Sequence, residues 1–256
     1  MAVALGAVIG IALGLLGGGG SILTVPIFVY VLHFAAKDAI AMSLAVVGAT
    51  SAIGVAGHWR AGNVNLRVGT VFGLVATAGT YAGARLAAYV SGAVQLAVFA
   101  LVMLVASAFM FRDRAASETA DHGPAARLGA AALVGFALGV GFLTGLVGVG
   151  GGFLIVPALV LLAVPMREAV GTSLAIIAVN CVVGFAGYLG HTVVDWSSVG
   201  LVTAGTAPGI ALGVGLHRRV PQSVLRRGFA LFLLVMAAFI LYQNASTIVA
   251  AWSSRA

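Results

Sequence analysis

The sequence predicts an all-α polytopic membrane protein: two inverted repeats of four hydrophobic segments, the first of each broken or re-entrant at a Gly-rich motif. Three features carry this prediction. The 256 residues are 62% hydrophobic and 7% charged, with a mean hydropathy of +1.16, too few polar side chains to cover a water-soluble surface. Several runs without charge approach or exceed the roughly 20 residues that cross a bilayer. The second half of the chain also repeats the first.

The positive charge indicates a membrane protein rather than a nucleic-acid-binding protein. The formal net charge is +7, but the 13 Lys and Arg residues are scattered over short loops, without an aromatic and basic surface. Basic loops are typical of the cytoplasmic side of membrane proteins. We therefore expect the lipid bilayer as a partner and no nucleic acid.

An internal duplication divides the chain at a polar linker. GLLGGGGSILTVP at residues 14–26 matches GLVGVGGGFLIVP at residues 145–157. DAIAMSLAVVGATSAIGVAG, beginning at Asp38, then matches EAVGTSLAIIAVNCVVGFAG, beginning at Glu168. The expected organisation is one transmembrane transporter domain, 1–256, with repeat 1 at 1–111, a linker at 112–127 and repeat 2 at 128–256.

The first segment of repeat 1, residues 2–32, is predicted to be broken. It carries four consecutive glycines followed by Pro26, and a Gly or a Pro inside a helix destabilises it by about 1 or 3 kcal/mol. Broken backbone at membrane depth is tolerated only inside protein or along a cavity, so a re-entrant hairpin is expected. Pro suits the first turn of a helix, so we expect the helices to restart at Pro26 and Pro157.

Segments two to four of each repeat predict spanning helices, with small residues such as Gly79 and Gly83 that permit close helix contact. Eight single crossings would divide the Lys and Arg residues almost evenly between the two sides. If the first segment of each repeat turns back, only Lys37, Arg85 and Arg255 fall on one side and all the others on the opposite side. This bias predicts inverted halves with both termini outside.

The Gly-rich breaks are the predicted binding site for a small anionic substrate. Helix N-termini and free amides at a broken helix can hold an anion near the midplane, and glycine lets these amides approach it. The alternative is that the glycines only let helices pack closely. The candidate residues are Gly17, Gly18, Gly19, Gly20, Ser21, Gly148, Gly150, Gly151 and Gly152.

Polar side chains within the apolar runs extend this site. Ser and Thr can instead bond a carbonyl of their own helix. No carboxylate lies deep in an apolar run, so proton or sodium coupling would need groups near the loop edges. The alternative for each of these groups is a residue that is solvated or faces lipid headgroups. The substrate candidates are Ser43, Thr50, Ser173 and Asn180, and the candidates for coupling or a gate are His58, Arg60, His191 and Asp195.

The twin Gly-rich motifs, each followed by an SLA helix that ends in AGH or AGY, resemble the sulfite exporter TauE/SafE family, also called TSUP permeases. The resemblance implies a multi-pass permease of the bacterial plasma (inner) membrane. It would export small sulfur-containing anions, such as sulfite, sulfonate or thiosulfate, by alternating access. An anion channel, or a permease for a different small organic anion, stays open as the alternative.

An enzyme is not expected. The apolar runs contain no catalytic set such as paired Asp, HExxH or Ser with His. We accordingly predict no catalytic residue, no metal and no cofactor, and the sequence leaves the oligomeric state open.

Overall fold

The computed structural model describes residues 2–16, 19–112, 130–147, 152–162, 164–217 and 219–253, and these are helical apart from short connections. The expected linker, 112–127, lies outside them except for Arg112. The elements in chain order are α1 (Ala2–Leu16), α2 (Gly19–Pro26), the π-helix η1 (Ile27–Val31), α3 (Ala36–Arg60), α4 (Leu66–Ala87), α5 (Gly92–Arg112), α6 (Ala130–Val147), α7 (Gly152–Leu161), α8 (Met166–Tyr188), α9 (Trp196–His217) and α10 (Gln222–Ser253).

Five of the described helices, α3, α5, α8, α9 and α10, are long and apolar enough to cross a membrane. The sequence predicts six spanning helices, and the sixth is α4. This helix matches α9 in length, but it is less apolar because it is rich in Gly, Ala and Thr and carries Arg67 and Arg85 in its end turns. The all-helical polytopic architecture is therefore confirmed.

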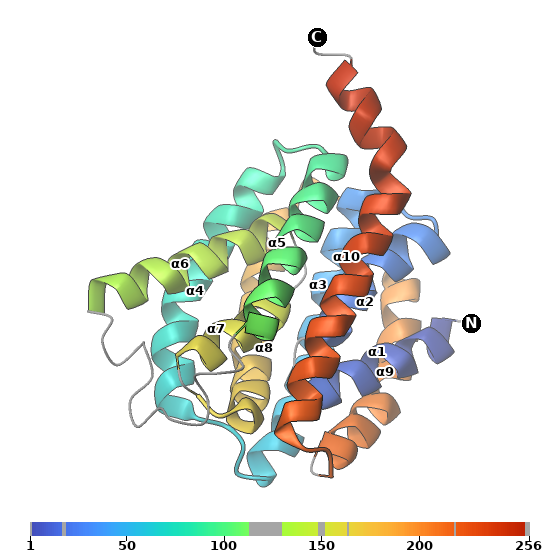
Figure 1. Cartoon of the computed structure of the whole chain (residues 1–256). Coiled ribbons are helices and arrows are strands. Elements are labelled where there is room, and N and C mark those ends of the chain that lie inside the picture. The colour runs from blue at the N-terminus through green and yellow to red at the C-terminus, as the bar shows by residue number, and fades with distance from the viewer. Residues whose placement is uncertain are drawn as a thin grey trace.

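The two halves exchange their first helices. Helix α1 packs along α9 of the second half, and α6 packs along α4 of the first half. In Figure 1 these two pairs lie on opposite sides of the bundle, while α5 and α10 run side by side between them. Each half thus completes the packing of the other.

The central helices α3 and α8 run antiparallel. Asp38, in the first turn of α3, accepts a hydrogen bond of 2.9 Å from the amide of Val193, which follows α8. Glu168, in the first turn of α8, accepts one of 3.2 Å from Asn65 Nδ2, which follows α3. These equivalent helices therefore point in opposite directions, as an inverted repeat requires.

Glycines hold the exchanged helices at backbone contact. A Cβ atom added to Gly79 or Gly83 on α4 would lie only 2.3 or 2.1 Å from the carbonyl oxygen of Leu138 or Phe142 on α6. No side chain fits in such a gap, so the prediction that Gly79 and Gly83 permit close helix contact is confirmed. The same arrangement joins α9 to α1 at Gly205, Gly209 and Gly213.

Each first segment is broken, as predicted: α1 ends at Leu16 before α2 begins, and α6 ends at Val147 before α7 begins. The first break reverses the chain. A Cβ atom at Gly20 would lie 2.4 Å from the Ile9 carbonyl oxygen and 2.5 Å from Leu13 Cβ, whereas a continuous helix would separate Gly20 from Ile9 by about 16 Å. Helices α1 and α2 therefore form a hairpin.

The prediction that the helices restart at the prolines is wrong. Pro26 is the last residue of α2 and Pro157 lies inside α7, so the restarts are at Gly19 and Gly152. A proline is tolerated there because neighbouring helices and local widening satisfy the carbonyl that it leaves free. After Pro26 the helix does widen, into η1.

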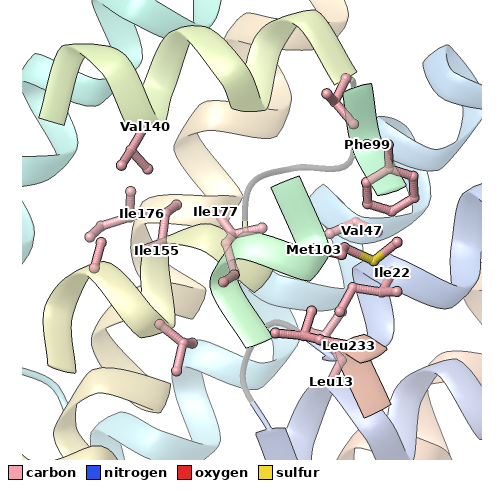
Figure 2. Packing of buried hydrophobic residues seen from close by; sticks show 14 of the residues in the cluster. Leu13, Ile22, Val47, Phe99, Met103, Val140, Ile155, Ile176, Ile177 and Leu233 are labelled. Carbon is pink, nitrogen blue, oxygen red and sulfur yellow. The ribbon is translucent and has the colours of Figure 1, made fainter. Parts of the chain in front are cut away.

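The hydrophobic core joins both broken segments to the central helices. Figure 2 shows side chains from the two segments converging with those of α3, α5, α8 and α10. The broken segments are thus enclosed by protein, where their free backbone groups can be satisfied. The labelled residues of this cluster are Leu13, Ile22, Val47, Phe99, Met103, Val140, Ile155, Ile176, Ile177 and Leu233.

Candidate functional site

The predicted glycine site is only partly described. Gly19 and Gly152 are the first residues of α2 and α7, so both lie where the sequence places free helix amides. Gly20 and Ser21 follow Gly19 in the first turn of α2, and Ser21 is fully buried. Outside the described residues lie Gly17, Gly18, Gly148, Gly150 and Gly151.

Gly20 is explained by packing. The contacts of its missing side chain with Ile9 and Leu13 are those of a hairpin whose arms touch. A side chain at this position would push α2 away from α1. For Gly20, close packing therefore accounts for the glycine without a ligand.

The carboxyl end of α1 is held by two histidines. Nε2 of His58, near the end of α3, lies 3.1 Å from the Gly14 carbonyl oxygen, and Nδ1 of His217, at the end of α9, lies 2.8 Å from the Leu15 carbonyl oxygen. Both side chains are fully buried. Their rings meet edge to face with centroids 5.1 Å apart. The last carbonyls of a helix have no partner within the helix, and these two are satisfied by imidazole N–H groups.

The carboxyl end of α6 is held in the same place by different chemistry. The Tyr188 hydroxyl donates to the carbonyl oxygens of Gly145 and Leu146, both at 3.2 Å. Gln95 Nε2 also donates to Leu146 at 3.3 Å and to the last carbonyl of α4, Ala87, at 3.1 Å. Both side chains are buried. The end that precedes each break is thus satisfied by side chains of other helices.

The candidate polar residues of α3 and α8 fall into two kinds. Ser43 and Ser173 each donate to the carbonyl three residues earlier, both at 2.8 Å, which is the local bond of the alternative interpretation. Thr50 makes such a local bond too, to the Val46 carbonyl at 2.7 Å, but both Thr50 and Asn180 bridge helices. Thr50 lies 2.7 Å from the Thr206 hydroxyl on α9, and Asn180 Oδ1 accepts from the Thr77 hydroxyl on α4 at 2.7 Å.

Asn180 also has a side-chain donor without a partner among the described residues. Its Nδ2 is buried and has no hydrogen-bond partner among the described residues, although a buried amide normally has one. The structure therefore leaves this donor unsatisfied by the residues that it describes.

The four loop-edge candidates are not brought together. His58 is fully buried, so the solvated alternative is wrong for it, because α1, which the sequence does not place beside α3, covers the ring. His191 is exposed after α8. Asp195 accepts from the Ser197 amide at 3.0 Å and from the Ser198 hydroxyl at 2.7 Å, and these bonds at the start of α9 lower its pKa.

Arg60 lies at a surface groove between α3 and α9. The groove has a volume of about 470 Å³ and its walls are otherwise apolar, including Ile53, Ile210 and Val214. On the other side of the molecule, the residues equivalent to Ala211 and Gly215 are Tyr81 and Arg85, whose side chains stack at 5.6 Å. The small residues Ala211 and Gly215 line the groove beside Arg60, whereas the equivalent residues on the other side carry large side chains.

Three site residues are missing from the sequence prediction: His217, Tyr188 and Gln95. The internal repeat aligns His58 with Tyr188. The sequence therefore shows that two equivalent helices each end in a side chain that can form hydrogen bonds. Nothing in the sequence, however, places α9 beside α1 or α5 beside α6. The exchange of helices between halves is what creates these contacts.

Comparisons with known proteins agree with this architecture. The family profile described as Sulfite exporter TauE/SafE matches residues 2–240. A probable membrane transporter protein of Xylella fastidiosa (strain Temecula1) is 31% identical over 249 residues, covering 96% of this chain and 95% of its own length. The probable membrane transporter protein YdhB of Bacillus subtilis is 27% identical, covering 85% and 90%. No solved structure matches.

Proposed function

Because this chain belongs to the TauE/SafE family of membrane transporters, we propose that it exports small sulfur-containing anions of the sulfite, sulfonate or thiosulfate class. Its class, a multi-pass transporter and not an enzyme, follows from the family. The substrate, the outward direction, alternating access and the bacterial plasma (inner) membrane are the proposal. The name of the matching family supports the sulfur anion.

The observation that carries the proposal is the hairpin at the first break. Helix α1 stops at Leu16, and α2, which begins at Gly19, packs back against α1 at the buried Gly20. The first amides of a helix have no partner within it and lie at its positive end, which favours an anion. The buried Ser21 hydroxyl lies in the same turn. Backbone amides there would bind the anion, with Asn180 Nδ2 as a further donor along the pathway.

The antiparallel α3 and α8 support inverted halves, and inverted halves with re-entrant first segments predict both termini outside. A tag at each terminus, tested for protease or antibody access in intact spheroplasts, checks this. Access to both tags is expected. A cytoplasmic C-terminus would contradict the topology without affecting the substrate.

A ligand screen tests the substrate class. The purified protein is heated with sulfite, thiosulfate, taurine, sulfoacetate, sulfate or chloride, because a ligand that binds the folded state raises its apparent melting temperature. We expect a selective rise with one sulfur anion. The same rise with chloride would instead favour a general anion site, and no rise with any of them would reject this substrate class.

The Gly19→Val variant tests the site, since a branched side chain would block approach to the first amides of α2. We expect it to insert and fold, but to lose both the ligand shift and flux into proteoliposomes. The matched control is Gly139→Val, at a position on α6 with no heavy atom within 4 Å. Flux that saturates and responds to a pH or sodium gradient distinguishes the permease from the channel.

A further inference from the structure

The groove between α3 and α9 combines an apolar lining with one charged residue. It has a volume of about 470 Å³, and its walls come from two helices that are each long and apolar enough to cross a membrane. Ile53 and Ala211 on these walls are exposed, so the groove opens to the outside of the bundle, where a membrane protein meets lipid. Apolar walls are expected there, but Arg60 is not, because a charge is costly to place among acyl chains.

The groove runs along the helices and reaches Arg60 at its end. On α3 it extends from Ile53 through Gly57 to Arg60, residues that helical spacing places on one face. This stretch of helix rises by about 10 Å. Ala211 and Gly215, about one turn apart on α9, form the facing wall. The groove therefore lies in the direction in which acyl chains lie, with a cation at one end.

Two exposed tryptophans indicate the level of Arg60 in the bilayer. Trp59, next to Arg60, is 53% exposed, and Trp196, at the start of α9, is 62% exposed. Tryptophan is enriched at both membrane–water interfaces, and the 22 residues of α9 span about 33 Å, close to the thickness of the hydrocarbon core. The far ends of α3 and α9 lie together, because the rings of His58 and His217 have centroids 5.1 Å apart. Arg60 is thus placed at the level of the lipid headgroups.

The charge around this end of the groove is positive. Besides Arg60, the exposed Arg219 follows directly after α9. Of the acidic residues that the structure describes, Asp38 and Asp195 lie at the starts of α3 and α9, which are the opposite ends of these helices. The carboxylate of Glu168, at the start of α8, already accepts a hydrogen bond. An anionic headgroup is therefore attracted to the end of the groove.

We propose that the groove binds one molecule of an anionic phospholipid, with an acyl chain along its apolar walls and the phosphate at Arg60. A guanidinium group can hold a phosphate through two parallel hydrogen bonds, and basic pockets between transmembrane helices bind anionic headgroups. The ammonium group of a zwitterionic phospholipid offsets the charge of its phosphate, so such a lipid binds less tightly. The bound lipid joins the ends of α3 and α9 at the outside of the bundle.

The equivalent face of the other half lacks these features, which limits the proposal to one lipid for each chain. The repeat places Gly190 where the first half has Arg60. Tyr81 and Arg85 replace the small residues of α9, and the Arg85 guanidinium stacks on the Tyr81 ring at 5.6 Å. Large side chains therefore occupy the positions that line the groove in the first half.

Native mass spectrometry of the delipidated protein tests the headgroup. Dioleoyl-phosphatidylglycerol and dioleoyl-phosphatidylethanolamine have the same acyl chains and differ in charge. We expect wild-type protein to bind one phosphatidylglycerol about fivefold more tightly than phosphatidylethanolamine, the effect of one basic residue near an anionic headgroup. Arg60→Gln should remove this preference. The matched control is Arg67→Gln, an exposed arginine at the start of α4 and outside the groove, which should keep it.

A second pair of variants tests the acyl-chain part of the groove. Gly215 and Gly200 are both exposed on α9, and a Cβ atom at either position meets no heavy atom within 4 Å, so both variants should fold. Only Gly215 lines the groove. Gly215→Leu should weaken the binding of both lipids severalfold, while Gly200→Leu should bind them as the wild type does.

Three results would overturn the proposal. The first is equal affinity of the wild type for the two lipids, or equal losses in Gly215→Leu and Gly200→Leu. The second is displacement of the lipid by glycerol phosphate at matched concentration, since a site for the phosphate alone needs no acyl chain. The third is a dimer that Gly215→Leu dissociates and that binds no lipid, which would assign the groove to a second copy of the chain. None of these measurements uses a transported anion, so the proposed function is tested separately.

Discussion

The carboxyl ends of α1 and α6 occupy equivalent places in the two halves, yet they are satisfied by unrelated side chains. His58 and His217 hold the first end, and Tyr188 and Gln95 hold the second. The fold therefore requires donors at these positions and not particular residues. Where the fold leaves this freedom the halves differ, and where it leaves none the halves agree.

Both halves use glycines where the exchanged helices touch. Disrupting one of these interfaces should cause the largest loss of stability. A Cβ atom at Gly141 on α6 would lie 1.9 Å from the Ala76 carbonyl oxygen, while one at Gly139 meets nothing within 4 Å. We expect Gly141→Ala to lower the free energy of unfolding by about 3 kcal/mol or more, with loss of monodisperse protein. Gly139→Ala should match the wild type, and equal losses for both would refute the interface.

Removing the Tyr188 hydroxyl should have the next largest effect. Tyr188→Phe takes one donor from the carbonyls of Gly145 and Leu146, and Gln95 remains to satisfy only the latter. A buried polar group without a partner costs about 1–3 kcal/mol. Chemical unfolding in detergent should show a loss of this size at every pH from about 5 to 8, since no group that titrates in this range is removed.

The hydrogen bonds that Thr50 and Asn180 make to other helices predict smaller losses of stability, and these losses should differ from each other. Thr77→Val removes the donor to Asn180 Oδ1, and Asn180 Nδ2 already has no partner among the described residues. After Thr50→Val, in contrast, the Thr206 hydroxyl keeps its bond to the Thr203 carbonyl. We expect Thr77→Val to cost about 1 kcal/mol and Thr50→Val about half as much. Unfolding of both variants in the same detergent measures the difference, and a larger loss for Thr50→Val would contradict it.

The smallest expected loss of stability comes from the side chains that cap the starts of α4 and α9. The equivalent residues there are Asn65, which accepts from the Val68 amide, and Asp195, which accepts from the Ser197 amide. The folded state lowers the pKa of Asp195, so its carboxylate stabilises the fold above the unfolded pKa, and this is lost as pH falls through the folded value. Asp195→Asn should therefore lower the melting temperature slightly at about pH 7, and not at about pH 3. If the melting temperatures of the variant and the wild type differ by the same amount at both pH values, the charge of Asp195 is not the source of the difference.

The sequence predicts the broad architecture well. The apolar helices and the interruption of each first segment follow from composition and helix energetics, and the structure has them. The restart at Pro26 is wrong because a proline is compatible with the inside of a protein-enclosed helix. His217 and Gln95 are missed because their partners lie on helices of the other half, and helix pairing between distant segments leaves no periodic signal in one sequence.

The exchange of first helices means that neither half is a finished structure. The glycines of α1 pack against α9, which is synthesised after all the helices from α2 to α8. The first hairpin therefore cannot complete its packing until α9 has left the ribosome and entered the membrane.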